Sequence, residues 1–262
     1  DVPYVDRHRL RKHLGTRRYI PTPYRPSTAK ALFDFIKPES VLDLSFGWGD
    51  RLAGFEASEY PKTYLGIDPD KRVLERGRKL HKLCRQTRKT VELYQSPAED
   101  FTYEVIENPV DMLYFAPPPF NTERYAEDDA QAYMRYTDEQ SFINDFLLKT
   151  VVKAWDTLKP GGTLALDLGD LRGPQHMGGR YKLADPLIRG ILRELPDAKY
   201  RGTVGAAVGH HKPTSSFDTV RVDPIWIITK GHSAVARRAL FGRKRAAQID
   251  AKQAESGQWV TQ

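Results

Sequence analysis

The sequence predicts an α/β fold in which a mainly parallel sheet carries helices on both faces. Apolar runs with strand character alternate with segments of helical periodicity, which is the pattern of such a sheet. The first run, 40–46, ends close to an acidic residue and two glycines. The second, 63–68, ends in another acidic residue, roughly twenty positions beyond the glycines. We therefore expect a ligand to bind beyond the carboxyl ends of the strands.

Each element of this fold has its own signal in the chain. We expect a first helix over 27–36, capped by Ser27, with four apolar residues at helical spacing: Ala31, Leu32, Phe35 and Ile36. Further helices are expected over 51–58, 70–88, 141–158 and 184–195. The remaining strands are expected over 90–95, 110–116, 163–168, 201–208 and 223–229. The last two should be antiparallel to each other.

Two basic segments flank the expected domain, which spans 19–231. Residues 1–18 are dense in arginine, lysine and histidine, and 232–262 form an alanine-rich basic segment of helical composition. With a formal net charge of +7 and a pI near 9.3, the chain favours a polyanionic partner, nucleic acid in particular. Either segment could contact phosphates or be a solvated extension, and the C-terminal one could also bind a protein partner.

Composition argues against several classes of protein. No apolar run approaches the length of a membrane span, and no secretory signal is visible. The single cysteine, Cys84, rules out an intramolecular disulfide and a multi-cysteine zinc site. The histidine pair at 210–211 is weak evidence for a metal, and we expect none. We expect a protein of the cytoplasm, nucleoid or nucleus that is not secreted.

The turn after the first strand suits a nucleotide-like ligand. Gly47 and Gly49 let backbone N–H groups and a helix N-terminus approach closely, because a Cβ would block that approach or forbid a positive φ. Asp68 is placed to accept hydrogen bonds from ribose hydroxyls. Asp43 would act on the ligand directly or through the turn that it stabilises. A dehydrogenase is disfavoured, since the loop lacks the third glycine of the dinucleotide fingerprint.

Three runs, Leu42–Arg51, Gly66–Pro69 and Phe115–Phe120, resemble the class I S-adenosylmethionine (SAM)-dependent methyltransferases. They are most similar to the amino-methyltransferases that modify an exocyclic amine of adenine or cytosine, and the likeness covers residues 19–230. The resemblance implies a Rossmann-like fold with a seven-stranded, mostly parallel sheet, and SAM as the cofactor. It implies cofactor contacts from Pro23, Asp43, Ser45, Phe46, Gly47, Gly49, Ile67, Asp68, Pro69, Ser96, Pro97, Ala98, Glu99 and Ala116.

The catalytic loop departs from the family pattern. In these relatives an Asp, Asn or Ser precedes two prolines and an aromatic residue; its side chain accepts hydrogen bonds from the target amine, and the ring stacks on a flipped base. The corresponding residues here are Pro117, Pro118, Pro119 and Phe120. Pro117 keeps a carbonyl but offers no side-chain acceptor. Losing one such bond at the reacting centre would cost about 2–4 kcal/mol in the transition state.

Two hypotheses follow from this departure. Either another group, such as Asn121 or Asp170, supplies the acceptor, or the chain is a catalytically weak or inactive subunit that binds nucleic acid and supports a catalytic partner. Phe120 would stack on the base in the first case and could merely pack in the second. DNA is favoured over RNA, with an RNA base methyltransferase as the alternative. Two insertions, 121–140 and 209–222, offer substrate contacts through Arg124, Tyr125, Tyr133, Arg135, His210, His211 and Lys212.

Overall fold

The computed structural model describes residues 23–84, 88–121, 123–125, 129–172, 180–207 and 222–231. The two basic segments, 1–18 and 232–262, lie outside these described residues, as do the candidate substrate contacts His210, His211 and Lys212. Within the described ranges, no helix combines the length and apolar character needed to cross a membrane.

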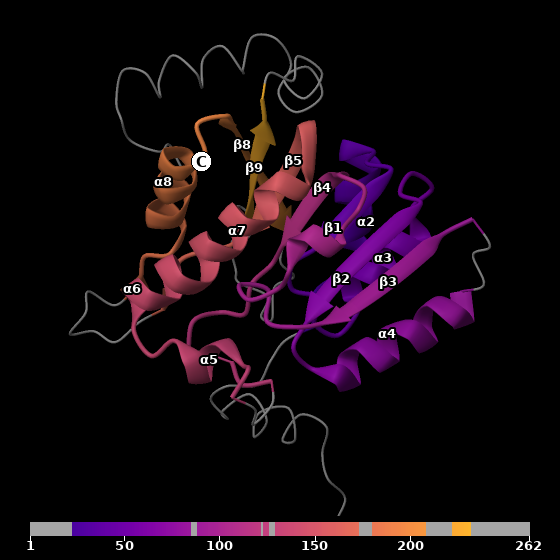
Figure 1. Ribbon diagram of the computed structural model, residues 1–262, viewed down its shortest axis with the longest axis horizontal. Coiled ribbons are helices and arrows are strands. Elements are labelled where there is room, and N and C mark those ends of the chain that lie inside the picture. Colours follow the sequence, from indigo (N-terminus) through magenta and orange to yellow (C-terminus); the bar gives the residue numbers. More distant parts are fainter. Residues whose placement is uncertain are drawn as a thin grey trace, which may run out of the picture.

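A seven-stranded sheet in the order β3-β2-β1-β4-β5-β9-β8 forms the centre of the molecule (Figure 1). Its strands are β1 (Ser40–Asp43), β2 (Thr63–Asp68), β3 (Thr90–Gln95), β4 (Val110–Phe115), β5 (Leu158–Asp167), β8 (Ala198–Ala207) and β9 (Val222–Lys230). The first five pair in parallel, whereas β9 is antiparallel to both β5 and β8. The predicted seven-stranded, mostly parallel sheet is confirmed. A separate two-stranded ribbon joins β6 (Leu171–Arg172) to β7 (Arg180–Tyr181).

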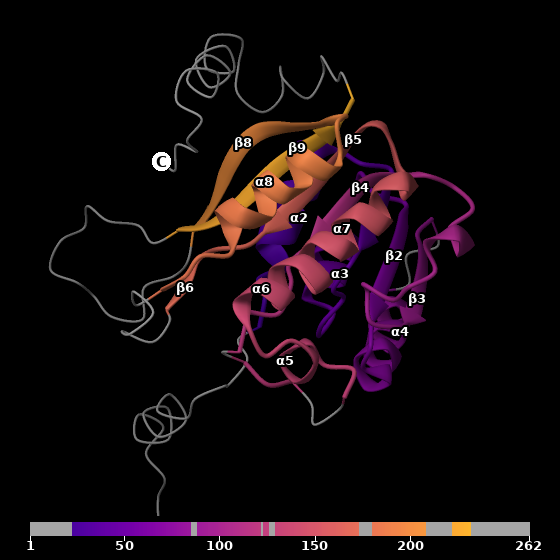
Figure 2. The ribbon, with the colours of Figure 1, turned by 60° about the vertical axis from the view of Figure 1, so that its left-hand side comes forward.

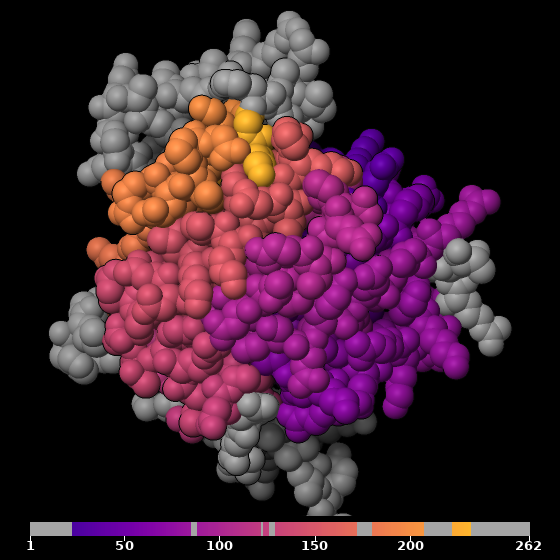
Figure 3. Space-filling view, in the orientation of Figure 1, coloured from indigo at the N-terminus to yellow at the C-terminus, as the bar shows by residue number. Residues whose placement is uncertain are grey.

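Helices cover both faces of this sheet. On one face lie α2 (Pro26–Ile36), α3 (Asp50–Ala57) and α4 (Lys71–Cys84), which share an apolar cluster with Val41 and Met112. On the other lie α7 (Lys149–Ala154) and α8 (Ala184–Glu194), which share a cluster with Leu42 and Leu113 (Figure 2). Neighbouring strand residues thus point to opposite faces, as the period of two requires. In the space-filling view, side chains on the α7 and α8 side largely cover the strands (Figure 3).

The segment between β4 and β5 is more divided than the sequence suggested. It contains the short helices α5 (Ala132–Arg135) and α6 (Glu139–Ser141), a π-helical stretch over Phe142–Leu148, and then α7. A 3₁₀ turn, Trp155–Thr157, leads directly into β5. The single helix expected over 141–158 is therefore a composite that starts two residues earlier.

The predicted start and buried face of the first helix are partly wrong. The helix α2 begins at Pro26, and Arg25 rather than Ser27 is its N-cap, without a side-chain cap. Proline suits the first helical position because its fixed φ is already helical and it has no N–H to leave unpaired. The buried residues are Ala29, Leu32 and Phe33, whereas Phe35 is 40% exposed. Packing against α3 and the sheet, which the spacing alone does not reveal, selects this face.

Candidate cofactor and substrate pocket

A pocket of about 1280 Å³ lies at the carboxyl ends of the central strands, where open α/β sheets bind their ligands. It is lined by most of the predicted site: Pro23, Ser45, Phe46, Gly47, Ile67, Asp68, Pro69, Pro97, Ala98, Glu99, Ala116, Pro117, Pro118 and Pro119. Five predicted residues do not line it: Asp43, Gly49, Ser96, Phe120 and Asn121. The structure therefore brings the glycine loop, the end of β2 and the proline loop to one place.

The glycine loop is anchored by a buried aromatic ring. Gly47 and Gly49 have φ values of 60° and 88°, the left-handed region that glycine tolerates. Between them and the sheet lies Phe46, which is 1% exposed. A Cβ built on Gly77 of α4 would stand 2.4 Å from Cζ of Phe46, and one on Gly66 of β2 would stand 2.8 Å from its Cδ2. Two further glycines therefore make room for the ring that supports the loop.

Asp68 closes the same loop from the end of β2. The backbone N–H of Gly47 donates to Oδ2 over 2.8 Å, and that of Asp70 donates to Oδ1 over 2.9 Å. Burial raises the pKa of Asp68 to about 6, although these two N–H groups oppose the rise. Each oxygen accepts one of these bonds and can accept another, and Asp68 lines the pocket. The carboxylate is thus oriented to accept hydrogen bonds from vicinal hydroxyls.

Asp43 supports the turn from the interior of the protein and does not line the pocket. Its side chain is fully buried and accepts the N–H of Ser45 over 3.0 Å, the Nε–H of Arg51 over 2.7 Å and the hydroxyl of Tyr64. Arg51 also donates to the carbonyl oxygen of Ser45. Both carboxylate oxygens are engaged in this way, so of the two roles considered for Asp43 the geometry favours the one through the turn.

Ser45 links the glycine loop to the proline loop. Its hydroxyl donates to the carbonyl oxygen of Ala116 over 2.8 Å and accepts the N–H of Ala116 over 3.2 Å. A movement of either loop would break both bonds. The part of the pocket lined by the glycine loop and the part lined by the proline loop are therefore mechanically coupled.

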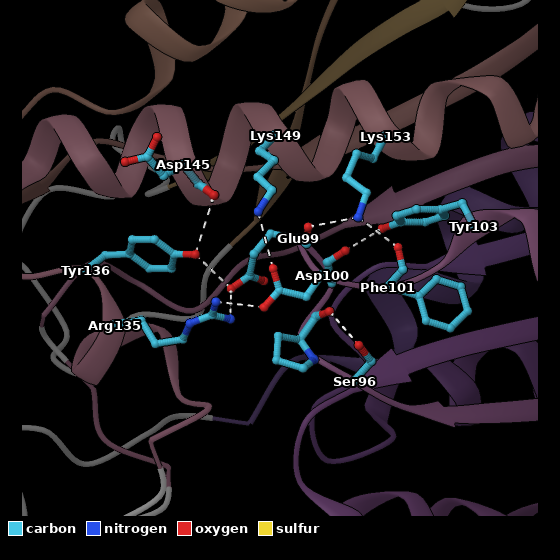
Figure 4. Close-up of polar contacts among 12 residues, drawn as sticks. Ser96, Glu99, Asp100, Phe101, Tyr103, Arg135, Tyr136, Asp145, Lys149 and Lys153 are labelled. Carbon is cyan, nitrogen blue, oxygen red and sulfur yellow. Dashed lines mark hydrogen bonds and ion pairs between the residues drawn. The ribbon is translucent and has the colours of Figure 1, made fainter.

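Glu99 is held by the insertion that follows β4 (Figure 4). The side chain is 2% exposed and accepts hydrogen bonds from Arg135 and, over 2.8 Å, from the hydroxyl of Tyr136. Arg135 also bridges to Asp100 over 2.7 Å, and Lys149 approaches the same carboxylate at 3.2 Å. Arg135 was a candidate substrate contact, but it clamps these two acids and does not line the pocket.

Phe120 does not have the position that base stacking requires. It is 2% exposed, and its ring packs against Phe142 and Tyr181 at centroid distances of 5.0 and 4.9 Å. The candidate replacement acceptors are also outside the pocket. Asn121 adopts a positive φ of 48°. Oδ1 of Asp170 is occupied at the start of α8, where it accepts the N–H groups of Leu183 and Ala184 over 3.0 and 3.2 Å.

Several pocket residues escaped the sequence reasoning. The hydroxyl of Tyr24 contacts a residue of β4 and one of β5: it is 2.7 Å from the hydroxyl of Tyr114 and donates to Oδ2 of Asp167 over 2.8 Å. Asp167 ends β5, just as Asp43 and Asp68 end β1 and β2, so the rule that identified those acids could have found it. Trp48 also lines the pocket, with its ring centroid 6.0 Å from that of Tyr125, which was a candidate substrate contact. Trp48 was visible as an aromatic residue between the two glycines of the predicted loop.

The arrangement of strands and pocket defines a fold class. The chain has the fold of the class I SAM-dependent methyltransferases, with the antiparallel strand β9 inserted between β5 and β8. No protein-family model and no curated protein matches the sequence. Solved structures do match.

Three matching structures illustrate the likeness. The N-methyltransferase NodS from Bradyrhizobium japonicum WM9 has a TM-score of 0.50 at 13% identity, over 78% of this chain and 94% of that one. PH0851 has a TM-score of 0.50 at 18% identity, over 80% of this chain and 46% of that one. The O-methyltransferase from Bacillus cereus in complex with SAH has a TM-score of 0.46 at 12% identity, over 85% and 88%.

Proposed function

We propose that this protein is a SAM-dependent methyltransferase that acts on an exocyclic amine of a nucleic-acid base, with adenine in DNA as the first candidate. One observation carries the proposal. A single pocket contains the glycine loop, the oriented carboxylate of Asp68 and the loop Pro117–Pro119 at the carboxyl edge of the sheet. The fold class supplies the context for this arrangement.

The described residues fit SAM in character and position. Asp68 would accept the ribose hydroxyls, and Ile67 and Pro69 would pack on the adenine ring. Because Glu99 is bound by Arg135 and Tyr136, backbone groups of 97–98 would contact the edge of the adenine ring. The backbone of 45–47 would face the amino-acid part. When bound, SAM supplies an electrophilic methyl group on a sulfonium.

The reaction side of the pocket has an acceptor and exposed rings. The Pro117 carbonyl can accept one hydrogen bond from a target amine, and direct transfer needs no covalent enzyme intermediate. With Phe120 buried, stacking on a base would come from Trp48, which is 42% exposed, together with Tyr125. The formal net charge of +7 favours a polyanionic substrate.

The burial of Phe120 and the lack of a side-chain acceptor at Pro117 favour one second candidate. The chain could be a catalytically weak subunit that keeps the fold, binds nucleic acid and supports a catalytic partner. An RNA base is the alternative substrate within the first candidate.

Methyl transfer from radiolabelled SAM to duplex DNA, single-stranded DNA and RNA tests the proposal, with SAM binding measured by calorimetry in parallel. We expect incorporation into one polymer, abolished by Asp68→Ala. Trp48→Ala should weaken polymer binding by about 5- to 150-fold, because a stacked base contributes about 1–3 kcal/mol. The matched control is Phe35→Ala, which removes a similarly exposed ring that does not line the pocket. SAM binding without incorporation would favour the subunit.

A further inference from the structure

We propose that Asp167 accepts a hydrogen bond from the target amine, and then its proton, in place of the side chain that Pro117 lacks. This inference rests on the proposed function and names the group that completes its reaction site. Four observations carry it: the place of Asp167 in the sheet, its free oxygen, the engagement of the competing carboxylates and the groups that face it.

Asp167 lies beside the proline loop because of strand register. In the parallel pair of β4 and β5, Phe115 is opposite Leu166. The next residues, Ala116 just beyond β4 and Asp167 at the end of β5, therefore lie side by side. Both line the pocket. A carboxylate at this position reaches the space above the loop from the neighbouring strand instead of from the loop itself.

One oxygen of Asp167 remains available. Oδ2 accepts the hydroxyl of Tyr24 over 2.8 Å, which fixes the orientation of the carboxylate. Oδ1 accepts no hydrogen bond from any residue in the part of the chain that the structure describes, and it is not among the fully buried unpaired atoms of that part. An amine in the pocket can therefore donate to Oδ1 without displacing a protein donor.

Other carboxylates of the pocket are less suited to this role. Glu123 accepts the hydroxyl of Tyr125, and Asp68 is committed to the glycine loop by two backbone N–H groups. Asp50 belongs to the first turn of α3. Asp223 is carried by β9, one strand further from β4 than β5. Asp167 ends β5, one of the two strands that pair with β4, and Asp43 at the end of the other, β1, has both oxygens engaged.

Groups from four surrounding elements set the charge of Asp167. Burial raises the pKa of Asp167 to about 6, and the negative charge of Asp223 on β9 adds to the rise. The hydrogen bond from Tyr24 and the positive charge of Arg51 on α3 oppose it. The hydroxyl of Tyr114 on β4 lies behind Tyr24. At neutral pH the carboxylate is thus mainly ionised, yet it is basic enough to take a proton, as a general base requires.

The chemistry balances without a further reactant. The nitrogen lone pair forms the new N–C bond while the C–S bond of the sulfonium breaks and its electron pair stays on sulfur. The nitrogen, positively charged for that moment, loses its proton to Oδ1 of Asp167. Water then removes the proton from the carboxyl group. The products are the methylated amine, S-adenosylhomocysteine and a solvated proton.

Binding without turnover gives the first test. The protein saturated with S-adenosylhomocysteine is titrated with two single-stranded oligonucleotides that contain either adenine or purine, which lacks the exocyclic amine. We expect the unaltered protein to prefer adenine by about tenfold or more, since the bond goes to a charged acceptor. Asp167→Ala, which removes the acceptor, should lose this preference, with S-adenosylhomocysteine binding unchanged as proof of folding. Asp185→Ala, at an exposed ion pair on α8, should keep it.

The acid limb of the methyl-transfer pH profile gives the second test. In the unaltered protein the rate should fall as Asp167 is protonated near pH 6. Tyr24→Phe should move that acid limb to higher pH, because it removes the hydrogen bond that lowers the pKa of Asp167, and Asp223→Asn should move it to lower pH, because it removes a charge that raises this pKa. Asp167→Asn should abolish the limb and lower kcat about 100-fold or more. Retained adenine preference in Asp167→Ala and an unmoved limb in Asp167→Asn would overturn the inference while leaving the proposed function standing. Absence of transfer by the unaltered protein would overturn the proposed function instead, and the binding test would still decide for or against Asp167.

Discussion

Replacing Gly77 by alanine should disturb the cofactor loop from a distance. Gly77 lies in α4, outside the pocket lining, but its missing Cβ leaves room for Phe46. The added atom would stand 2.4 Å from Cζ of Phe46 and 2.9 Å from Cδ1 of Leu93, closer than real carbon atoms approach. The ring is 1% exposed and cannot swing into solvent, so the loop that it anchors must shift.

The expected size follows from two opposing effects. Overpacking a closed core costs about 1–3 kcal/mol, whereas alanine in place of glycine stabilises a helix interior by about 0.5–1 kcal/mol. We therefore expect Gly77→Ala to lower the free energy of unfolding by about 1–2 kcal/mol, the difference between these effects. SAM affinity should also fall, because Phe46 carries the backbone of Gly47.

Urea unfolding and calorimetric titration with SAM measure both effects. The matched control is the double variant Gly77→Ala, Phe46→Leu, in which the smaller side chain leaves space for the new methyl group. We expect the two substitutions to be non-additive, with the alanine costing less in the Phe46→Leu background than alone. The reasoning would be refuted if Gly77→Ala raised the free energy of unfolding, or if its effect on that free energy were the same in the Phe46→Leu background as in the unaltered protein.

Two further predictions concern the charges beneath the loop. Arg51→Met should lower the free energy of unfolding by about 3–5 kcal/mol, because it leaves the buried carboxylate of Asp43 without its ion pair. The control Arg72→Met, at an exposed ion pair, should lower it by less than about 1 kcal/mol. Denaturation curves that show an equal loss of stability in both variants would contradict this account. Asp68→Asn should raise stability at pH 7 by less than the roughly 3 kcal/mol that the rise of its pKa from 3.8 to about 6 represents, because the amide nitrogen leaves the N–H of Gly47 or of Asp70 without an acceptor.

The sign of the pH effect at Asp68 follows from proton linkage. A carboxyl group with a raised folded pKa binds more protons in the folded state, so its contribution favours folding as pH falls from about 6 toward 3.8 and disfavours folding at neutral pH. The pKa of Asp167 is raised in the same way, so both acids contribute to the dependence of unfolding free energy on pH. Asp68→Asn should therefore remove only the part of this dependence that Asp68 contributes. An unchanged slope between pH 4 and 6 would show that the pKa of Asp68 is not raised.

The cofactor side of the pocket was largely predictable because it depends on local chain features. A strand that ends in an acid and a glycine turn fix their own geometry, so Gly47 and Asp68 meet as expected. The mainly parallel sheet followed from the alternation of strands and helices. Asp43 was harder, because its partner Tyr64 lies on another strand and only the fold shows that both carboxylate oxygens are occupied.

The reaction side was less predictable because it is assembled from distant segments. The burial of Phe120 depends on Phe142 and Tyr181, and no pattern around residue 120 reveals those contacts. The bond between Tyr24 and Asp167 spans 143 positions in the chain. Only the pairing of β4 with β5 and the path of the segment before α2 bring these residues together, so the sequence could suggest a missing acceptor without locating a substitute.

Calorimetric titration with SAM of the unaltered protein, Asp68→Ala and the remote control Asp185→Ala tests the central claim most directly. The account predicts saturable one-to-one binding to the unaltered protein and to Asp185→Ala. Asp68→Ala should bind at least about tenfold more weakly, because hydrogen bonds to a charged acceptor contribute about 1.5–3 kcal/mol. No binding to the unaltered protein, or equal binding to all three, would contradict the assignment of this pocket to the cofactor.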